Sequence, residues 1–535
     1  MLIKCIESII VFFINLLTGA LPSSGSGRRA DPVPGPSVPA DRPVLIGNVI
    51  PSARDALRQT KPSPQEVRIG TEERLKHILL TGGTGAGKTT LLMNIIEDDI
   101  MAGGRGVGFI DFRGELCDRL LTRLATRYSP EDLADRLLLI DLRSPRPQQG
   151  TEKFSIGFNP LAQGNNPYSQ AMFVMDVLRQ QFGASLGVQT EELCRNMLLA
   201  MALSPQSLPL TDIEVFLTSL EARAALLGGI EDSSVLRFFR RYDALPEVQR
   251  NQWISPVMNK ISPMLALPSL RLLLGDSQSL SLRNFLDARA DAIVLICLAA
   301  DEIYGAASLI GTLFVNAIGS SLMRSDRNAT PFFLFLDEFQ NLAAGSVDQF
   351  SVMISEARRF KLGLTLSHQS TTQLDPKLRV LTRNVISIHA IFSTGGVDAD
   401  LLAGEIPSDE PKTVLKHLLL SQRPGEALLV RRGHPTVQIK THYSPDPNVP
   451  AAAIQALRQA SMRRHGRPAA EVEAELRTRE ALFLPGEAGV KGKPQAGTQS
   501  GPSAPTRPRK RGQAPRPASS NQQQYEVREG DNDNN

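Results

Sequence analysis

The glycine-rich segment at residues 82–89 constrains this chain more than any other part of its sequence. It reads GGTGAGKT, follows the apolar residues 78–80 and precedes the apolar, helix-like stretch 91–96. Glycines let such a loop point its backbone N–H groups at an anion, and the helix that follows contributes the positive end of its dipole. A strand, a glycine loop and a helix in this order are what a triphosphate-binding P-loop requires. We therefore expect a nucleotide-binding α/β domain.

The side chains of this loop are expected to bind ATP and Mg²⁺. Lys88 would reach the β- and γ-phosphate oxygens, and the hydroxyl of Thr89 would ligate the metal ion. The residues expected to contact the nucleotide are Gly82, Gly83, Thr84, Gly85, Ala86, Gly87, Lys88, Thr89 and Thr90.

A second group of candidate residues follows the apolar run 332–336, which reads FFLFL. A run this continuous is typical of a strand in the middle of a parallel sheet, because both faces of such a strand are covered. The carboxylates of Asp337 and Glu338 would then lie at the carboxyl edge of the sheet, where open α/β folds bind ligands. We expect Asp337 to hold Mg²⁺, directly or through water, and Glu338 to act as the general base.

Gln369 is the candidate sensor of the site. It follows the apolar strand expected at 362–367, so its amide would lie near the γ-phosphate or the attacking water. The alternative, an ordinary polar residue at a strand end, stays open. Its neighbour His368 is expected to be a structural or solvent-facing histidine, and not a catalytic one. The segment DFRGE at 111–115 ends another expected strand, and its carboxylate and guanidinium are either close to the nucleotide or ordinary loop residues.

The pair Arg358 and Arg359 supplies candidates for an arginine that acts on the nucleotide of a neighbouring subunit. In ring-shaped motors such an arginine stabilises the phosphate charge of the transition state. Both residues belong to a helix-like segment, so the alternative is the solvated face of an amphipathic helix. Arg383 is a second candidate.

The order of patterns along the chain predicts an α/β fold with a parallel-centred sheet and an all-α inserted domain. Strands and helices alternate up to about residue 161, apolar spacings of three and four follow, and strands then return. The expected parts are a hydrophobic segment at 1–21, a disordered linker at 22–41, the first part of the ATPase domain at 42–165, the all-α insertion at 166–276, the second part of the ATPase domain at 277–449, exposed C-terminal helices at 450–484 and a disordered tail at 485–535.

The hydrophobic segment 1–21 has three interpretations. Its apolar core is shorter than an ordinary spanning helix and contains Asn15, so a short or tilted membrane anchor competes with an amphipathic or buried helix. A cleaved signal peptide is the third interpretation, although export would separate an ATP-driven enzyme from ATP.

Composition permits a nucleic-acid partner without requiring one. The formal net charge is only +4, and aromatic residues make up 5% of the chain with a single Trp, which is sparse for a surface that stacks bases. The cysteines are far apart and form no CxxC pair, so we expect reduced thiols and no metal site. They are Cys5, Cys117, Cys194 and Cys297.

Taken together, the motifs resemble those of the HerA/FtsK-like P-loop ATPases, and within them the coupling ATPases of type IV secretion and conjugative DNA transfer. The matching segments are RPVLIG (42–47), LKHILLTGGTGAGKTT (75–90), DFRGEL (111–116), GFNPL (157–161), SPVMNKISPMLALPSLRLLLG (255–275), FLDEFQNLAA (335–344), SEARRFKLGLTLSHQSTTQL (355–374), NVISIHAIFSTGGVDADLLAGEI (384–406) and HGRPAAEVEAEL (465–476).

The resemblance implies a RecA-like motor that assembles as a homo-hexamer around DNA and couples ATP hydrolysis to DNA movement. It makes Arg358 the best candidate for the arginine acting in trans and Gln369 the sensor. It also implies relaxase or secretion-channel partners, and a cytoplasmic ATPase domain held at the inner face of the membrane by segment 1–21. The chain departs from the family at Ser393, where many relatives carry arginine, and in having one hydrophobic stretch where plasmid coupling proteins usually have two.

Two other kinds of function stay open beside the DNA-transfer motor. One is a HerA-like helicase, or a secretion or packaging motor whose cargo is protein. The other is a nucleotide-gated docking protein for a relaxase or secretion channel, although Lys88 and Glu338 together favour hydrolysis over a passive switch.

Overall fold

The structure is a computed structural model that describes residues 42–50, 65–143, 153–164, 166–183, 187–205, 208–303, 305–323, 330–343 and 347–483. The expected hydrophobic segment at 1–21, the linker at 22–41 and the tail at 485–535 lie outside the described residues.

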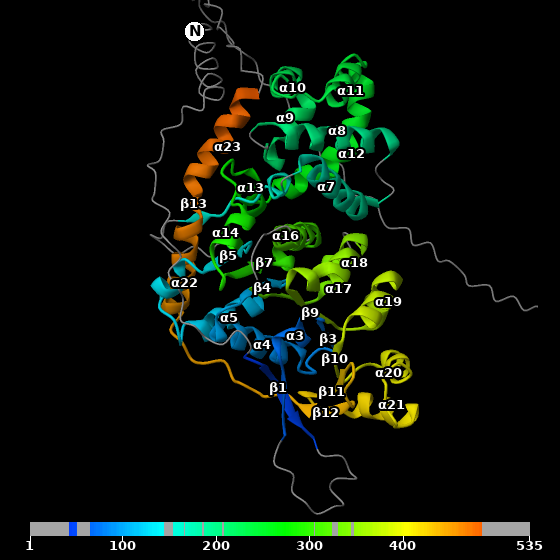
Figure 1. Cartoon of the computed structure of the whole chain (residues 1–535). Helices are drawn as coiled ribbons and strands as arrows, with labels where there is room; N and C mark the ends of the chain where they lie inside the picture. The colour runs from blue at the N-terminus through cyan, green and yellow to red at the C-terminus, as the bar shows by residue number, and fades with distance from the viewer. Residues whose placement is uncertain are drawn as a thin grey trace, which may run out of the picture. The chain divides into compact units, whose positions relative to one another are not determined.

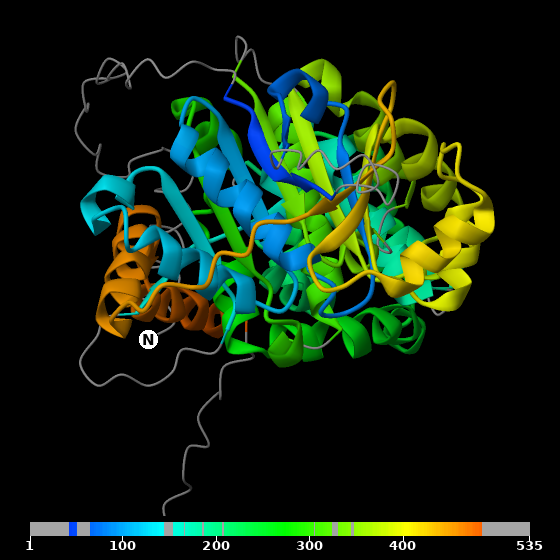
Figure 2. The same ribbon diagram turned by 90° about the horizontal axis from the view of Figure 1, so that it is seen from below.

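An 11-stranded sheet forms the centre of the fold (Figures 1 and 2). The strands that run parallel are, in order across the sheet, β10 (Ile388–Phe392), β3 (Ile78–Thr81), β9 (Leu362–His368), β8 (Phe332–Leu336), β4 (Gly106–Asp111), β7 (Ile293–Cys297) and β5 (Leu137–Asp141). The strands that continue the sheet in antiparallel fashion beyond β10 are β11 (Glu426–Arg431), β12 (Val437–Lys440), β1 (Val44–Val49) and β2 (Glu66–Ile69). The α/β fold predicted from the sequence is confirmed.

Helices cover both faces of the parallel strands, which explains why those strands are mostly apolar. Residues that alternate along each strand enter two different cores: Leu80 and Phe335 belong to one, and Leu79 and Leu336 to the other. The first core is closed by α4 (Lys88–Ala102) and α5 (Glu115–Leu124). The second is closed mainly by α16 (Ala306–Met323), α17 (Phe339–Ala343), α18 (Val347–Glu356) and α19 (Pro376–Val385).

Strand β9 lies between β3 and β8, although β8 directly precedes it in the chain. This crossover brings the carboxyl ends of β3, β9 and β8 side by side. Three loops that are distant in sequence therefore meet at one edge of the sheet.

The inserted helices lie between β5 and β7 in the chain and share the second core with the sheet (Figure 1). They are α7 (Pro167–Phe182), α8 (Val188–Leu203), α9 (Ile213–Thr218), α10 (Leu220–Leu227), α11 (Ser233–Asp243), α12 (Glu247–Leu265), α13 (Pro268–Gly275) and α14 (Leu282–Ala288). Smaller elements are α3 (Thr71–Arg74), α6 (Pro130–Ala134), α15 (Ala300–Ile303), α20 (Gly396–Ala403), α21 (Lys412–Ser421), β6 (Phe154–Ser155) and β13 (Arg467–Pro468).

One helix of the described chain, α16, is long and apolar enough to cross a membrane by length and composition. Its most apolar window is 72% buried inside the protein, and it contributes Ile310 and Phe314 to the second core. Its hydrophobicity is therefore accounted for by packing within the fold.

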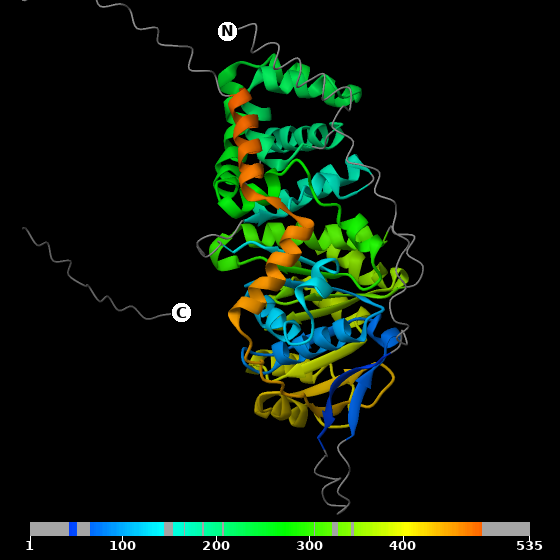
Figure 3. The ribbon, with the colours of Figure 1, turned by 90° about the vertical axis from the view of Figure 1, so that its left-hand side faces the viewer.

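The sequence suggested that the C-terminal helices α22 (Ala451–His465) and α23 (Ala469–Phe483) are exposed, but Leu457 of α22 and Leu476 of α23 are buried. Both helices run along one side of the fold (Figure 3). Helix α22 lies along the edge strand β5, where Ser461 is fully buried. Its hydroxyl donates to the backbone O of Leu137 at 2.7 Å and accepts from the backbone N of Leu139 at 3.0 Å. A side chain thus satisfies backbone groups that an edge strand would leave unpaired.

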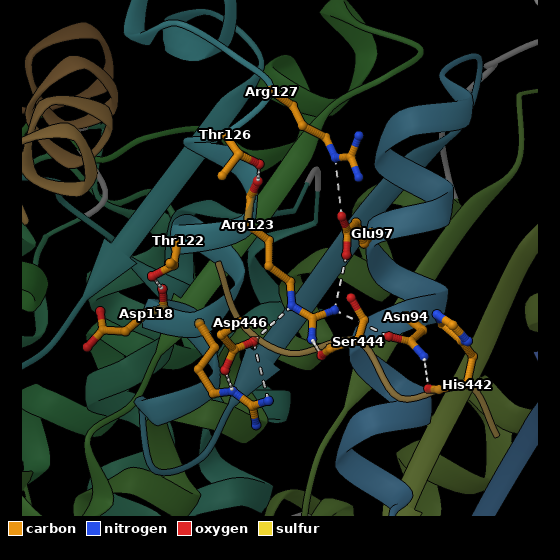
Figure 4. Close-up of polar contacts among 11 residues, drawn as sticks. Asn94, Glu97, Asp118, Thr122, Arg123, Thr126, Arg127, His442, Ser444 and Asp446 are labelled. Atoms are coloured by element: carbon orange, nitrogen blue, oxygen red, sulfur yellow. Dashed lines mark hydrogen bonds and ion pairs between the residues drawn. The ribbon is translucent and has the colours of Figure 1, made fainter. Parts of the chain in front are cut away.

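An extended segment at 441–450, here called the strap, connects β12 with α22 and crosses the outer side of α4 and α5 (Figure 2). Its anchor is Arg123 of α5, which is 2% exposed (Figure 4). The Arg123 guanidinium donates to the Ser444 backbone O at 2.8 Å and to Asp446 at 3.0 Å. It also donates to Glu97 of α4 at 3.0 Å. One buried cation therefore joins the P-loop helix, its neighbour and the strap.

We expect Arg123→Met to lower the free energy of unfolding by about 3 kcal/mol, because it leaves two carboxylates without their buried cation. The matched control is Arg127→Met. Arg127 is exposed and contacts the same Glu97, at 3.3 Å, so its loss is expected to cost no more than about 0.5 kcal/mol. Urea denaturation of both variants measures the difference, and equal midpoints would show that the strap is not held by this network.

Candidate active site

The P-loop occupies the turn between β3 and α4 and is supported from behind by two other strands. The N–H of Gly83 donates to the backbone O of Ser393, just after β10, at 2.7 Å. The N–H of Gly425, just before β11, donates to the backbone O of Ala86 at 2.8 Å. The loop is thus fixed between the carboxyl end of β10 and the amino end of β11.

Glycine is required at position 87 on two independent grounds. Gly87 has φ +114° and begins α4, and a Cβ there would lie 2.8 Å from the backbone N of Gly425. Its neighbour Gly85 has φ +74° with open space beside it. The loop therefore combines a tightly packed base with an open rim, and the first N–H groups of α4 point toward that rim without a side-chain cap.

Lys88 lies back across the loop. Its Nζ donates to the backbone O of Gly82 at 2.6 Å and of Gly83 at 2.9 Å. Burial lowers the pKa of its ammonium, while the nearby charges of Asp337 and Glu338 oppose that shift. The carboxylates predicted from the end of β8 thus lie close enough to Lys88 to interact with it electrostatically.

Asp337 lies in the interior of the site. Burial raises the pKa of its carboxyl, and a hydrogen bond from Ser367 of β9 partly offsets that effect. A cation at this carboxylate would favour its ionised form. A bound Mg²⁺ would therefore stabilise the ionised carboxylate, which is the form of Asp337 that binds a metal ion.

Glu338 has φ +49°, an uncommon backbone conformation for a residue with a side chain. The Gln369 amide donates to Glu338 Oε1 at 3.0 Å, and the Thr84 hydroxyl donates to the other end of that amide at 3.4 Å. Gln369 therefore links the P-loop to the predicted general base, as a sensor would require.

His368, which was expected to be structural or solvent-facing, is buried directly beside Gln369, so it does not face solvent. Its Nε2 lies 2.9 Å from the hydroxyl of Thr81, the last residue of β3. Burial lowers the pKa of this imidazole to about 4, so it is neutral near pH 7. The histidine joins the base of the P-loop to the sensor strand and carries no charge into the site.

The DFRGE segment after β4 divides its two side chains between two roles. Asp111 turns inward and accepts from the backbone N–H groups of Arg113 at 3.1 Å and Cys117 at 2.9 Å, which stabilises the start of α5. Arg113 points the other way, and its guanidinium lies 3.3 Å from Glu338 Oε1. The arginine of this segment, rather than its aspartate, reaches the candidate site.

Arg358 and Arg359 lie in the 3₁₀ helix η4 (Ala357–Phe360), which precedes β9, and both are exposed. Gln369 follows the other end of that strand, and seven residues of β9 span about 20 Å. Neither arginine can reach the P-loop of its own chain. Arg383 ends α19 near the same distant edge of the sheet and is paired with Glu405 at 2.7 Å.

Several residues of the site carried no signal that sequence reasoning used. Asn341 donates to Glu338 Oε2 at 3.3 Å, and its spacing of three from Glu338 at a helix start is the pattern that would have indicated it. Ser393 and Gly425 support the loop through backbone atoms, which any residue type supplies. Only the three-dimensional approach of β10 and β11 reveals them.

We expect Gly87→Ala to weaken ATP binding at least about tenfold, because either the P-loop or the Gly425 turn must move to admit a methyl group. Gly104→Ala is the matched control, since Gly104 has φ +64° but nothing within 4 Å of its Cβ position. It should lose stability and keep its affinity. Titration with a fluorescent ATP analogue, beside thermal unfolding, separates the two effects, and equal affinities would rule out the steric argument.

Comparison with known proteins identifies the fold. No protein-family model matches the sequence, and no curated protein matches it. The bacterial conjugative coupling protein TrwB, in a trigonal form with sulphate, matches with a TM-score of 0.54 and 15% identity over 77% of this chain and 97% of that one. TrwB with ADP and Mg²⁺ gives 0.52 and 15% over the same shares, and TrwB with the ATP analogue ADPNP gives 0.52 and 14%.

Because these sequence identities are low, the matches establish the fold alone. At the level of the fold, they confirm the resemblance to coupling ATPases that the motifs indicated. Strands β3, β8 and β9, which lead to the P-loop, to Asp337 and to Gln369, belong to a sheet of that kind. Helices are inserted between β5 and β7. The described chain has the fold of the conjugative coupling protein TrwB.

Proposed function

We propose that this protein hydrolyses ATP with Mg²⁺ and couples the reaction to the movement of DNA in a conjugative or type IV secretion-like transfer system. The observation that carries the proposal is the meeting of Lys88, Asp337, Glu338 and Gln369 at one edge of the sheet. A triphosphate cradle, an acidic metal ligand, a candidate base and a sensor are the parts that phosphoryl transfer to water needs.

The residues present fit ATP and Mg²⁺. The Lys88 ammonium donates its hydrogen bonds to carbonyls of the P-loop itself, and phosphate oxygens can replace these neutral acceptors. The rim at Gly85 is open, and the uncapped start of α4 favours an anion. Thr89 and Asp337 supply the hydroxyl and the buried carboxylate that Mg²⁺ would bind, and the ion would neutralise charge on the phosphate oxygens.

The chain's own groups then have distinct tasks. Lys88 holds the phosphates by charge, and the N–H groups of the loop orient them. Glu338 accepts the proton of the attacking water, and Gln369 positions that water through its contacts with Glu338 and Thr84. Because Glu338 has φ +49°, the backbone aims its carboxylate from a fixed direction.

The position of Arg358 supports a shared site in a homo-hexamer. Arg358 is exposed, far from its own P-loop, and forms no ion pair within the described part of the chain. This guanidinium, at the amino end of β9, is available to the nucleotide of a neighbouring subunit, where it would stabilise the transferring phosphate. DNA as cargo is proposed from the likeness to a conjugative coupling protein. Relaxase or channel partners and attachment to the inner face of the membrane belong to the same proposal.

Glu338→Gln is expected to reduce ATP turnover at least about a hundredfold while ATP still binds, because the amide cannot take a proton. Glu356→Gln, at an exposed position on α18, is the matched control and should behave like the wild type. Turnover is measured without DNA, with single-stranded DNA and with double-stranded DNA. If neither single-stranded nor double-stranded DNA changes the turnover rate of the wild type, a protein cargo or a docking role is favoured.

A shared site also predicts complementation between two inactive variants. Arg358→Ala subunits keep Glu338, and Glu338→Gln subunits keep Arg358, so mixed assemblies regain some complete interfaces and should recover turnover. Mixing Arg383→Ala with Glu338→Gln examines the second candidate arginine in the same way. The assay follows turnover against the mixing ratio, with light scattering to give the size of the assembly. Absence of recovery in assembled mixtures would count against a site completed by Arg358.

A further inference from the structure

Glu338 is already engaged on both of its oxygens. Its Oε1 accepts a hydrogen bond from the Gln369 amide at 3.0 Å and forms an ion pair with the Arg113 guanidinium at 3.3 Å, and its Oε2 accepts from Asn341 at 3.3 Å. The cation therefore lies at the oxygen that Gln369 joins to the P-loop. A water that bonds to this oxygen must compete with it.

The three partners of Glu338 differ in how firmly they are held. Asn341 lies on α17, three residues from Glu338, and moves with it. Gln369 is fixed at the end of a fully buried strand. Arg113 extends from the loop between β4 and α5, and its side chain is 58% exposed, while that of Glu338 is 15% exposed. Of the three, only Arg113 can leave Glu338 for solvent without disturbing a packed element.

The backbone of Arg113 is fixed even though its guanidinium is not. Its N–H donates to Asp111, whose other oxygen accepts from Cys117 of α5. Next to it, the O of Phe112 accepts from the N–H of Ala300 at 3.0 Å. The backbone of the loop is therefore held in place, and only the long, flexible side chain of Arg113 has to move.

We propose that Arg113 is a positioning residue that restrains Glu338 and keeps ATP turnover low until a phosphate group competes for its guanidinium. The inference rests on the proposed hydrolysis. Arg113 is well suited to such an exchange, because a guanidinium binds carboxylate and phosphate with the same planar donors. The competing phosphate comes either from DNA or from the bound nucleotide, and turnover with and without DNA separates the two sources.

The test compares ATP turnover by the full-length wild type and by Arg113→Ala. Without DNA and at saturating ATP, the variant is expected to turn over ATP at least about fivefold faster, because the restraint on Glu338 is gone. If DNA is the competitor, KM for ATP is unchanged and stimulation by DNA largely disappears. If the nucleotide is the competitor, the stimulation factor stays and KM for ATP rises, because a contact with the bound phosphate is lost.

Three further variants identify the route of the effect. Arg113→Lys keeps the charge near Glu338 and should restore most of the restraint. Adding Glu338→Gln to Arg113→Ala should abolish the gain, since Arg113 acts through Glu338. Arg119→Ala removes an exposed arginine of α5 that pairs with Asp446, away from the site, and should match the wild type.

An Arg113→Ala rate equal to or below that of the wild type overturns the restraint, while a normal wild-type response leaves the proposed hydrolysis intact. A fall in kcat together with a lower thermal midpoint would mean that Arg113 is merely structural. If neither protein turns over ATP under any condition, the proposed function and the restraint both fail.

Discussion

Burial of both faces of the central sheet is the constraint on which the rest of this molecule depends. Strands β8 and β9 are buried along their whole length, so they must lie between helices, and polar side chains that can reach a ligand lie where the strands end. Because β9 is inserted between β8 and β3, three such ends adjoin. The P-loop, the acidic pair and Gln369 are neighbours for this reason, despite being up to 285 residues apart in the chain.

The local parts of this arrangement were readable from the sequence. The P-loop, the continuous strand before Asp337 and the strand before Gln369 are patterns contained in short windows, and the sheet rule places their ends together. The contacts between these distant segments could not be predicted from the sequence. That Arg113 meets Glu338, or that Gly425 supports Ala86, depends on which strands become neighbours and how closely, and neither single residue carries a periodic signal.

The two arginines considered for the site show how position decides chemistry. Arg113 and Arg358 are both exposed cations next to buried strands, Arg113 in a loop and Arg358 in the 3₁₀ helix η4. Arg113 leaves the carboxyl end of β4 and touches the candidate base of its own chain. Arg358 precedes the amino end of β9 and lies a strand length away from that base. An arginine side chain is thus suited to restrain Glu338 of its own subunit in one position and to contact the nucleotide of a neighbouring subunit in the other.

Ser461 gives the order of synthesis a physical meaning. The edge of β5 forms its backbone contacts with a side chain that follows it by 322 residues. While the ribosome makes the intervening helices and strands, that edge exposes unpaired N–H and C=O groups, which are templates for pairing with other chains. The nascent protein therefore has an aggregation-prone edge until residues 451–465 have been made, because α22 is the helix that closes it.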